Sequence, residues 1–303
     1  MEGYFVYSVA LTTFIYPIIV HWGWAGGFLS AWGASAGPLF SKDPATSNGM
    51  IDFAGSGVVH MVGGFSGLMG AIICGPRTGR FVDGQVMELW QGNKVLQSLG
   101  TFSLWFGWYG FNCGSTLAIS KGLANVAGKV AVTTTISAAS GGITATVLGK
   151  ILTKNYDITL GLNGLLAALV SVTASCAVVE PWHAFIIGSI GASLFVIGHY
   201  ALLKLKIDDP CDACIVHGLC GTWGILAVGI FCTDRNVQYA AYPNVNDACR
   251  RGEQFGVQVV GALAIMTWTC ATAGFTFMAV NLTIGLRVSP EIEQAGLDVS
   301  EHG

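Results

Sequence analysis

The sequence predicts an all-α polytopic membrane protein, because it carries few charges and spaces them widely. Of its 303 residues, 52% are hydrophobic and 10% are charged, and the mean hydropathy is +0.61. Soluble domains carry about 25% charged residues. The charges leave eight stretches of at least 20 residues without any charge, and about 20 apolar residues cross the bilayer core. Only helices and closed barrels satisfy the backbone in lipid, and these stretches lack the alternation of barrel strands.

The eight predicted helices follow one another along residues 1–286, which we expect to form one transmembrane domain. Charged residues set their limits: Asp52 and Arg77 bound the second, and Asp212 and Asp234 bound the seventh. We expect residues 287–303 to begin a cytoplasmic C-terminal tail. The helices are predicted at about 4–29, 53–76, 96–119, 130–149, 159–179, 182–203, 214–233 and 255–284.

Basic residues predict the orientation, since they are enriched in cytoplasmic loops. One set of alternating loops holds eight of them: Arg77, Arg80, Lys94, Lys150, Lys154, Lys204, Lys206 and Arg287. The other set holds six: Lys42, Lys121, Lys129, Arg235, Arg250 and Arg251. We therefore expect both ends of the chain to be cytoplasmic. Cys232 and Cys249 flank one loop of the second set and could form a disulfide if that loop is extracellular.

An internal repeat relates the second and seventh helices. Both fit the pattern D-x7-H-x3-G-x2-G, first at Asp52, His60, Gly64 and Gly67, and again at Asp209, His217, Gly221 and Gly224. The predicted topology makes the two helices run in opposite directions across the membrane. Inverted repeats of this kind place the substrate site near the midplane.

The two repeat histidines are candidate site residues, because an ionisable group within a membrane helix is a functional hypothesis by default. Each lies about 12 Å along its helix from the preceding aspartate, and the following glycines permit close helix approach. His60 and His217 are therefore predicted to meet, one nitrogen donating to the other. Two alternatives remain open here: each satisfies an ordinary core hydrogen bond, or the pair ligates a haem iron.

The chain resembles the ammonium transporter family (Amt/Mep/Rh), and within it the plant-type members. The resemblance lies in IDFAGSGVVHMVGGFSGLMGAIICGPRTGRF at 51–81, GWYGFNCGSTLA at 107–118, NGLLAALVSVTASCAVVEPW at 163–182, DDPCDACIVHGLCGTWG at 208–224 and AGLDVSEHG at 295–303. It implies the ammonium-transporter fold with its inverted repeat, of whose eleven helices eight are present. We expect the family's first three helices to precede Met1.

The resemblance also implies a role for each site residue. His60 and His217 match the twin pore histidines, Trp24 and Ser115 the outer recruitment site, and Phe111 one ring of the gate below it. Asp52 matches the aspartate that supports recruitment and takes part in proton release. Ser300 falls at the family's phosphorylated position. His21, His183 and His199 match no pore position, and we interpret them as structural or interfacial.

The implied function is transport of ammonium, with methylammonium as an analogue, by a homotrimer in the bilayer of the plasma membrane. Recruitment of the cation would be followed by deprotonation and passage of ammonia and a proton. We expect no enzymatic activity, no cofactor, no metal and no nucleic-acid partner. The main alternative is a transport-dead or ammonium-sensing regulatory subunit. A Rh-type conductor of neutral gas fits less well, since a tryptophan–serine site suits a cation.

Overall fold

The computed structural model describes residues 2–31, 49–89, 92–242 and 247–302, so Lys42 lies outside the described residues. Apart from one short hairpin, its regular elements are helices, three of them π-helical turns. In chain order they are α1 Glu2–Ala10, η1 Leu11–Ile15, α2 Tyr16–Trp24, η2 Ser56–Met61, α3 Val62–Cys74, β1 Phe81–Val82, β2 Gln85–Val86, α4 Lys94–Gly114, α5 Leu123–Thr153, α6 Ile158–Thr173, α7 Pro181–Leu205, η3 Cys214–Leu219, α8 Cys220–Phe231, α9 Asp234–Tyr239, α10 Arg251–Thr283, α11 Pro290–Ala295 and α12 Leu297–His302.

Six of the described helical stretches are long and apolar enough to cross a membrane, where the charge spacing predicted eight. They are Glu2–Trp24, Ser56–Cys74, Leu123–Thr153, Pro181–Leu205, Cys214–Phe231 and Arg251–Thr283. The two remaining predicted spans correspond to α4 and α6. The apolar helix α6 has only 16 residues, because the chain leaves the helix after Thr173 for a run of turns. It is nevertheless packed on α5, α7 and α8.

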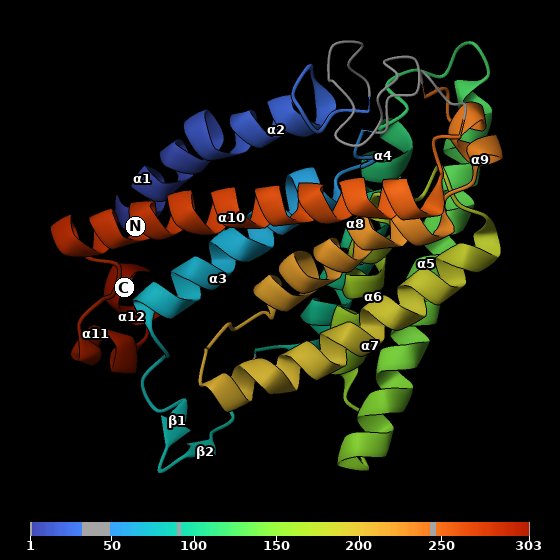
Figure 1. Cartoon of the computed structure of the whole chain (residues 1–303). Coiled ribbons are helices and arrows are strands. Elements are labelled where there is room, and N and C mark those ends of the chain that lie inside the picture. The colour runs from blue at the N-terminus through green and yellow to red at the C-terminus, as the bar shows by residue number, and fades with distance from the viewer. Residues whose placement is uncertain (1, 32–48, 90–91, 243–246, 303) are drawn as a thin grey trace.

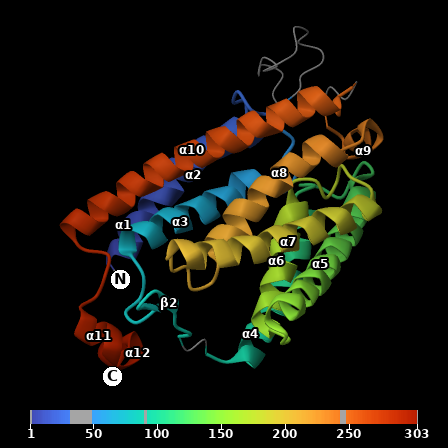
Figure 2. The same ribbon diagram turned by 60° about the horizontal axis from the view of Figure 1, so that its bottom comes forward.

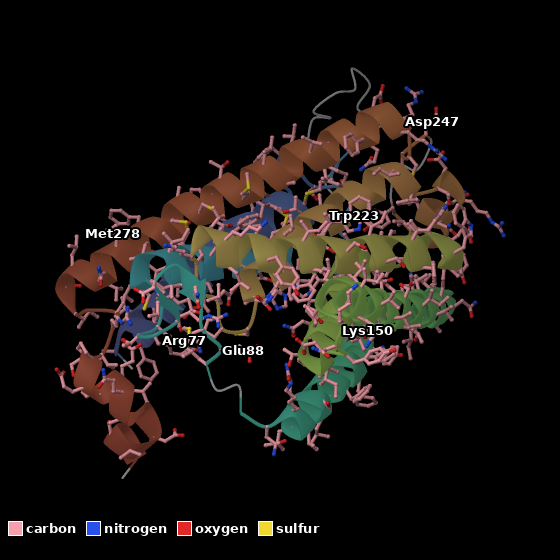
Figure 3. The ribbon with its side chains drawn as sticks, turned by 90° about the horizontal axis from the view of Figure 1, so that it is seen from below. Arg77, Glu88, Lys150, Trp223, Asp247 and Met278 are labelled. Carbon is pink, nitrogen blue, oxygen red and sulfur yellow. A yellow bond between two sulfur atoms is a disulfide. The ribbon has the colours of Figure 1, made fainter. Side chains whose placement is uncertain are left out.

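The helices form one bundle with two distinct ends (Figures 1 and 2). The chain's first and last elements and the β1–β2 hairpin lie at one end, which we call the hairpin end; α9 lies at the opposite end, the α9 end. Figure 3 shows Arg77 toward the first and Asp247 at the second. The hairpin turns at Asp83 and Gly84, both with positive φ, as a tight two-residue hairpin requires.

Two groups of helices meet along α3 and α8. On one side α5, α6 and α7 pack together, with α4 against α5 and α6; on the other, α10 lies along α3 and α8 and also contacts α1. Between the two groups, η2 contacts α8 while α3 contacts η3. Because the start of each span meets the end of the other, the two spans run antiparallel, as the inverted repeat predicts.

Glycine makes this crossing close. A Cβ added at Gly64 would overlap the backbone of Gly218, and one added at Gly221 would lie 2.6 Å from the carbonyl oxygen of Ser56. Gly224 likewise packs on the Ser56 hydroxyl, whereas a Cβ at Gly67 would meet nothing within 4 Å. The expectation of close approach is therefore wrong for Gly67, since α3 has moved away from its partner at that turn.

The tail returns to the hairpin end. Arg287 pairs with Glu293 at 2.9 Å, and Glu293 accepts the backbone N–H of Thr78 at 2.8 Å. Beside this contact, Arg77 donates to Asp208 through its side chain at 2.8 and 2.9 Å. Although burial by itself raises the carboxyl pKa, the hydrogen bonds and charge of Arg77 hold the pKa of Asp208 below its ordinary value.

Candidate functional site

The two repeat histidines meet where the two spans cross. Nδ1 of His60 and Nδ1 of His217 lie 3.2 Å apart, and the ring planes are inclined by 21°. Each histidine belongs to a π-helical turn, η2 or η3, that opens its span. Single π-turns within α-helices occur often at functional sites. The predicted contact is therefore present, and it lies at matching positions of the two repeats.

Aromatic rings surround His60 on its other sides. The Trp108 ring is stacked on it at 5.1 Å between centroids, and the Phe111 ring lies at 5.5 Å. Trp108 is fixed by its own indole N–H, which donates to the Thr173 hydroxyl at 3.0 Å. Nε2 of His60 is buried and has no hydrogen-bond partner among the described residues. An unpaired buried nitrogen is costly, so this atom is the natural place for a small hydrogen-bonding ligand.

The geometry of the pair argues against ligation of a haem iron. An iron between the two rings would need a bond of about 2 Å to each nitrogen, as for other metal–imidazole bonds. The observed 3.2 Å is instead a hydrogen-bond distance. The haem alternative is therefore incompatible with the distance between the two nitrogens.

Asp52 lies at the start of the second span and is almost fully buried. One carboxylate oxygen accepts the N–H of Gly55 at 3.0 Å, and the other accepts those of Gly57 and Val58 at 3.0 and 2.8 Å. These are the free N–H groups of the first turn, where negative charge is favoured. Burial nevertheless raises the pKa of Asp52 to about 6, while these backbone hydrogen bonds lower it.

The backbone carbonyl group of Asp52 links this residue to Trp24. The indole Nε1 of Trp24 donates to the carbonyl oxygen of Asp52 at 2.7 Å. Gly55 lies against the same indole with a φ of +107°, and a Cβ added there would approach the ring to 3.1 Å. A side chain at position 55 would therefore push Trp24 away from its partner.

Trp24 and Ser115 line one cavity of about 500 Å³ near the α9 end, together with Phe53, Thr116, Leu117, Leu123, Ala240 and Ala241. The wall is mostly apolar, with an indole face and two hydroxyls available to a ligand. Ser115 donates its hydroxyl to the carbonyl of Phe111 at 2.8 Å, which leaves its oxygen lone pairs free to accept. Phe111 thus links Ser115 of the cavity wall to the histidine pair, because its carbonyl accepts from Ser115 and its ring contacts His60.

Ser300 is the one candidate that stands apart. It lies in α12 at the hairpin end, is exposed, and donates its hydroxyl to the carbonyl of Gly296 at 3.0 Å. The other six candidates lie between the cavity and the crossing of the two spans, linked by the contacts described above.

The model of the Ammonium Transporter Family matches residues 1–303, the whole chain. The chain belongs to the ammonium transporter family. Among its relatives is "Putative ammonium transporter 1 member 5" of Arabidopsis thaliana, 41% identical over 99% of this chain and 62% of that protein. Ammonium transporter Amt2 of Archaeoglobus fulgidus is 38% identical over 99% of this chain and 63% of its own length. The chain thus spans less than two thirds of the length of these relatives.

Solved structures share the fold of this family member. A protein described as "Sensor Amt Protein" superposes with a TM-score of 0.82 at 36% identity, over 97% of this chain and 68% of that one. Mep2 of Saccharomyces cerevisiae superposes with a TM-score of 0.81 at 26% identity, over 96% of this chain and 62% of that one. The all-α membrane transporter fold predicted from the sequence is therefore confirmed.

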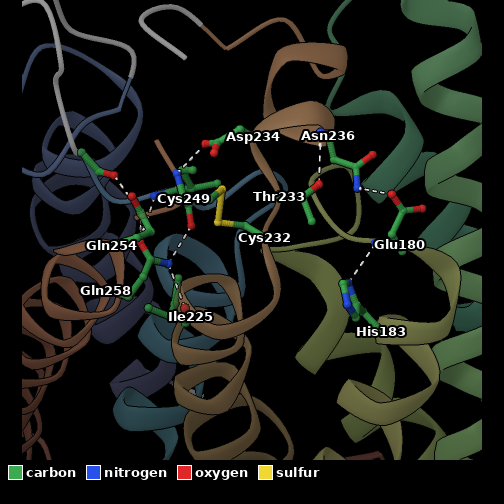
Figure 4. The surroundings of a disulfide bond; sticks show 12 residues. Glu180, His183, Ile225, Cys232, Thr233, Asp234, Asn236, Cys249, Gln254 and Gln258 are labelled. Carbon is green, nitrogen blue, oxygen red and sulfur yellow. Dashed lines mark hydrogen bonds between the residues drawn. A yellow bond between two sulfur atoms is a disulfide. The ribbon is translucent and has the colours of Figure 1, made fainter. Parts of the chain in front are cut away.

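The structure adds one residue to the site and decides one open prediction. The sequence alone does not single out Trp108, which stacks on His60; its place three residues before Phe111, on the same helix face, is the signal that identifies it. The disulfide that the sequence leaves open is present: Cys232 and Cys249 are bonded, with their Cα atoms 5.8 Å apart (Figure 4).

Proposed function

We propose that this chain transports ammonium by taking up the cation at the α9 end and passing ammonia and its proton along the histidine pair. The observation that carries the proposal is the contact of the buried His60 with the half-buried His217 across two antiparallel π-turns. The free Nε2 of His60 supports it, since a neutral ammonia molecule can both donate to and accept from imidazole nitrogens.

Recruitment is assigned to the cavity of Trp24 and Ser115. A cation over an indole face gains about 0.5–2 kcal/mol, and a hydroxyl oxygen adds an acceptor for one of the four N–H groups of ammonium. Potassium has nearly the same charge and size, so this cavity alone would discriminate poorly. Loss of the proton before the apolar passage supplies the selectivity, because a metal ion cannot become neutral.

The passage is assigned to Phe111, His60 and His217. Phe111 is proposed as the gate, because its carbonyl accepts from Ser115 of the cavity wall and its ring lies 5.5 Å from that of His60; a ligand passing here would have to displace that ring. Asp52 supports recruitment by holding Trp24 through its carbonyl group, and its carboxyl group is the nearest candidate for proton release. The two imidazoles, 3.2 Å apart, then offer a relay for the proton beside the ammonia.

The test is a current measurement on the 303-residue chain in liposomes with an imposed ammonium gradient. We expect a current in the wild type, and its loss in His217→Ala, since the relay and the ligand's hydrogen-bond partner are both removed. His21→Ala is the matched control: His21 is an exposed histidine on α2, and its replacement should leave the current unchanged. Currents of equal size in the wild type and His217→Ala would overturn the assignment.

Ammonium sensing is the second candidate, favoured by the likeness to a solved structure described as a sensor. A sensor would bind methylammonium, seen as a rise in thermal unfolding temperature, without carrying flux in the same liposomes. Phosphorylation of Ser300 would suit either role, because it adds charge to the exposed helix α12 of the tail.

We also propose a homotrimer in the plasma membrane with the hairpin end in the cytoplasm. The orientation is supported by the basic residues of that end, among them Arg77 and Arg287. The oligomer is proposed from membership of the family, and the exposed apolar rings of Phe102 and Phe106 on α4 offer a face on which a second subunit can pack. The measurement is light scattering of the purified protein in detergent. After the mass of the bound detergent is subtracted, the protein mass should be three times that of the monomer.

A further inference from the structure

We infer that Ser56 is a positioning residue for the histidine pair: its hydroxyl group keeps the end of α6 open, and the carbonyl groups freed there hold the backbone between Asp52 and η2. Ser56 is the first residue of η2, the π-turn that carries His60. The inference rests on the proposed function of the histidine pair.

The Ser56 hydroxyl lies between two backbone groups that a continuous helix would join directly. It donates to the carbonyl oxygen of Val170 at 2.7 Å and accepts the N–H of Ala174 at 2.7 Å. Ala174 follows Val170 by four residues, which is the spacing of an α-helical hydrogen bond. A side chain inserted at such a hydrogen bond interrupts a helix, and α6 ends at Thr173.

The surroundings fix the hydroxyl in this place. Ser56 is fully buried, as are Val170 and Ala174. Gly224 of α8 packs on it, since a Cβ added there would lie 2.6 Å from Oγ of Ser56. Ala174 retains helical dihedral angles, with φ −67° and ψ −33°. Without the hydroxyl, its N–H would therefore bond the Val170 carbonyl after a small movement, and α6 would continue.

The interruption frees two carbonyl groups for another segment. The N–H of Ala54 donates to the carbonyl of Thr173 at 3.2 Å, and the N–H of Phe53 donates to the carbonyl of Ala174 at 3.0 Å. In a continuous helix these carbonyl groups would instead accept from N–H groups one turn further along the chain. The end of α6 therefore holds the two residues that follow Asp52.

The segment held in this way connects the cavity to the histidine pair. Phe53 lines the cavity, and η2 with His60 begins three residues later. Thr173, at the end of α6, also accepts on its hydroxyl the indole N–H of Trp108, whose ring is stacked on His60. Continuation of α6 would remove the first support and displace the second. Nδ1 of His60 would then move out of its 3.2 Å contact with His217.

The test compares methylammonium uptake by the wild-type chain and Ser56→Ala in liposomes. Uptake is expressed per folded protein, so that a loss of folded chain does not count as a loss of transport. We expect the maximal rate of Ser56→Ala to fall by about tenfold or more, since a misplacement of about 1 Å can slow a positioned reaction by about 100-fold. An unchanged maximal rate in Ser56→Ala overturns the inference.

Ser175→Ala is the matched control. Ser175 is buried in the run of turns that follows α6, and its hydroxyl donates to the carbonyl of Val172, three residues earlier, at 3.3 Å. Its replacement also removes a buried hydroxyl, but it leaves the Ser56 contacts intact. Ser175→Ala should therefore transport like the wild type, and an equal loss of rate in both variants overturns the inference.

Hydrogen exchange in detergent reports the held segment itself. The amides of residues 53–54 should exchange faster in Ser56→Ala than in the wild type, because their carbonyl partners are withdrawn. Ser56→Cys keeps a weaker donor and acceptor at the same place, so its exchange should be intermediate, and it replaces Ser56→Ala in the comparison if that variant does not fold. If the wild type carries no methylammonium, the proposed function fails and exchange alone decides: unchanged exchange at 53–54 overturns the inference, and faster exchange supports it.

Discussion

Replacing Gly64 by alanine tests whether the histidine pair depends on the close crossing of the two spans. The new Cβ would lie 2.5 Å from the Cα of Gly218 and 2.6 Å from the carbonyl carbon of His217. It would lie closer still to the Gly218 nitrogen. All three are backbone atoms, so no side-chain rotation can relieve the overlap. The two spans must move apart.

The required movement follows from ordinary contact distances. Carbon atoms pack at about 3.5–4.0 Å, so α3 and η3 must separate by about 1 Å at this point. The Nδ1–Nδ1 distance of 3.2 Å between His60 and His217 would then exceed the length of a hydrogen bond. Overpacking costs about 1–3 kcal/mol of folding stability, and a misplacement of about 1 Å can slow a positioned reaction by about 100-fold.

We therefore expect Gly64→Ala to unfold at a lower temperature and to lose at least about nine tenths of its maximal methylammonium uptake. Gly67→Ala is the matched control, because it adds the same methyl group to the same helix where nothing lies within 4 Å. The measurements are the unfolding midpoint in detergent and uptake into liposomes at equal protein. If Gly64→Ala behaves like Gly67→Ala in both, the crossing does not position the pair and the reasoning is wrong.

Three further predictions concern the cavity, the buried carboxyl group and the orientation. Trp24→Phe removes the indole N–H that donates to Asp52 and weakens the cation–π contact, so the KM for methylammonium should rise by about two- to tenfold. Trp22→Phe is the control. If the two variants have the same KM for methylammonium, the prediction is contradicted. Because the pKa of Asp52 is raised from 3.8 to about 6, the folded chain keeps a proton that the unfolded chain loses, and stability should fall as pH rises from about 4 to 6; unfolding midpoints of Asp52→Asn should lack this slope. The exposed thiol of Cys211 should react with an impermeant maleimide only from the cytoplasmic side, and best at alkaline pH, since burial and Asp209 raise the pKa of that thiol; labelling from outside in intact cells would reverse the orientation.

The fold class and the histidine contact could be predicted because each depends on a strong, local physical constraint. Charge is excluded from the bilayer core, so the spacing of charges outlines most of the spans. A histidine at matching depth in two inverted segments needs a partner, and His217 is the partner that the repeat offers His60. Neither inference requires knowledge of side-chain packing.

The features that escaped prediction depend on packing and on helix geometry. The charge-free stretch continues to Val179, but α6 ends at Thr173. The prediction missed this end because the spacing of charges does not show where a helix gives way to turns. The repeat gives Gly67 and Gly224 the same position, yet only Gly224 meets another segment. The π-turns η2 and η3 likewise have no signature in apolar periodicity, although each carries a site histidine.

The repeat pattern D-x7-H-x3-G can now be explained position by position. Each aspartate accepts backbone N–H groups from the start of its span: Asp52 from Gly55, Gly57 and Val58, and Asp209 from Cys214 at 2.7 Å. The aspartates thereby anchor the two π-turns, and the turns aim the histidines at each other. The glycine four residues later lets the partner backbone approach, as Gly64 does against Gly218. Since anchoring, aiming and approach are separate tasks, the three positions should fail differently: loss of Asp52 should change the pH dependence of stability as well as flux, loss of the histidine should change flux, and loss of the glycine should lower stability and flux together.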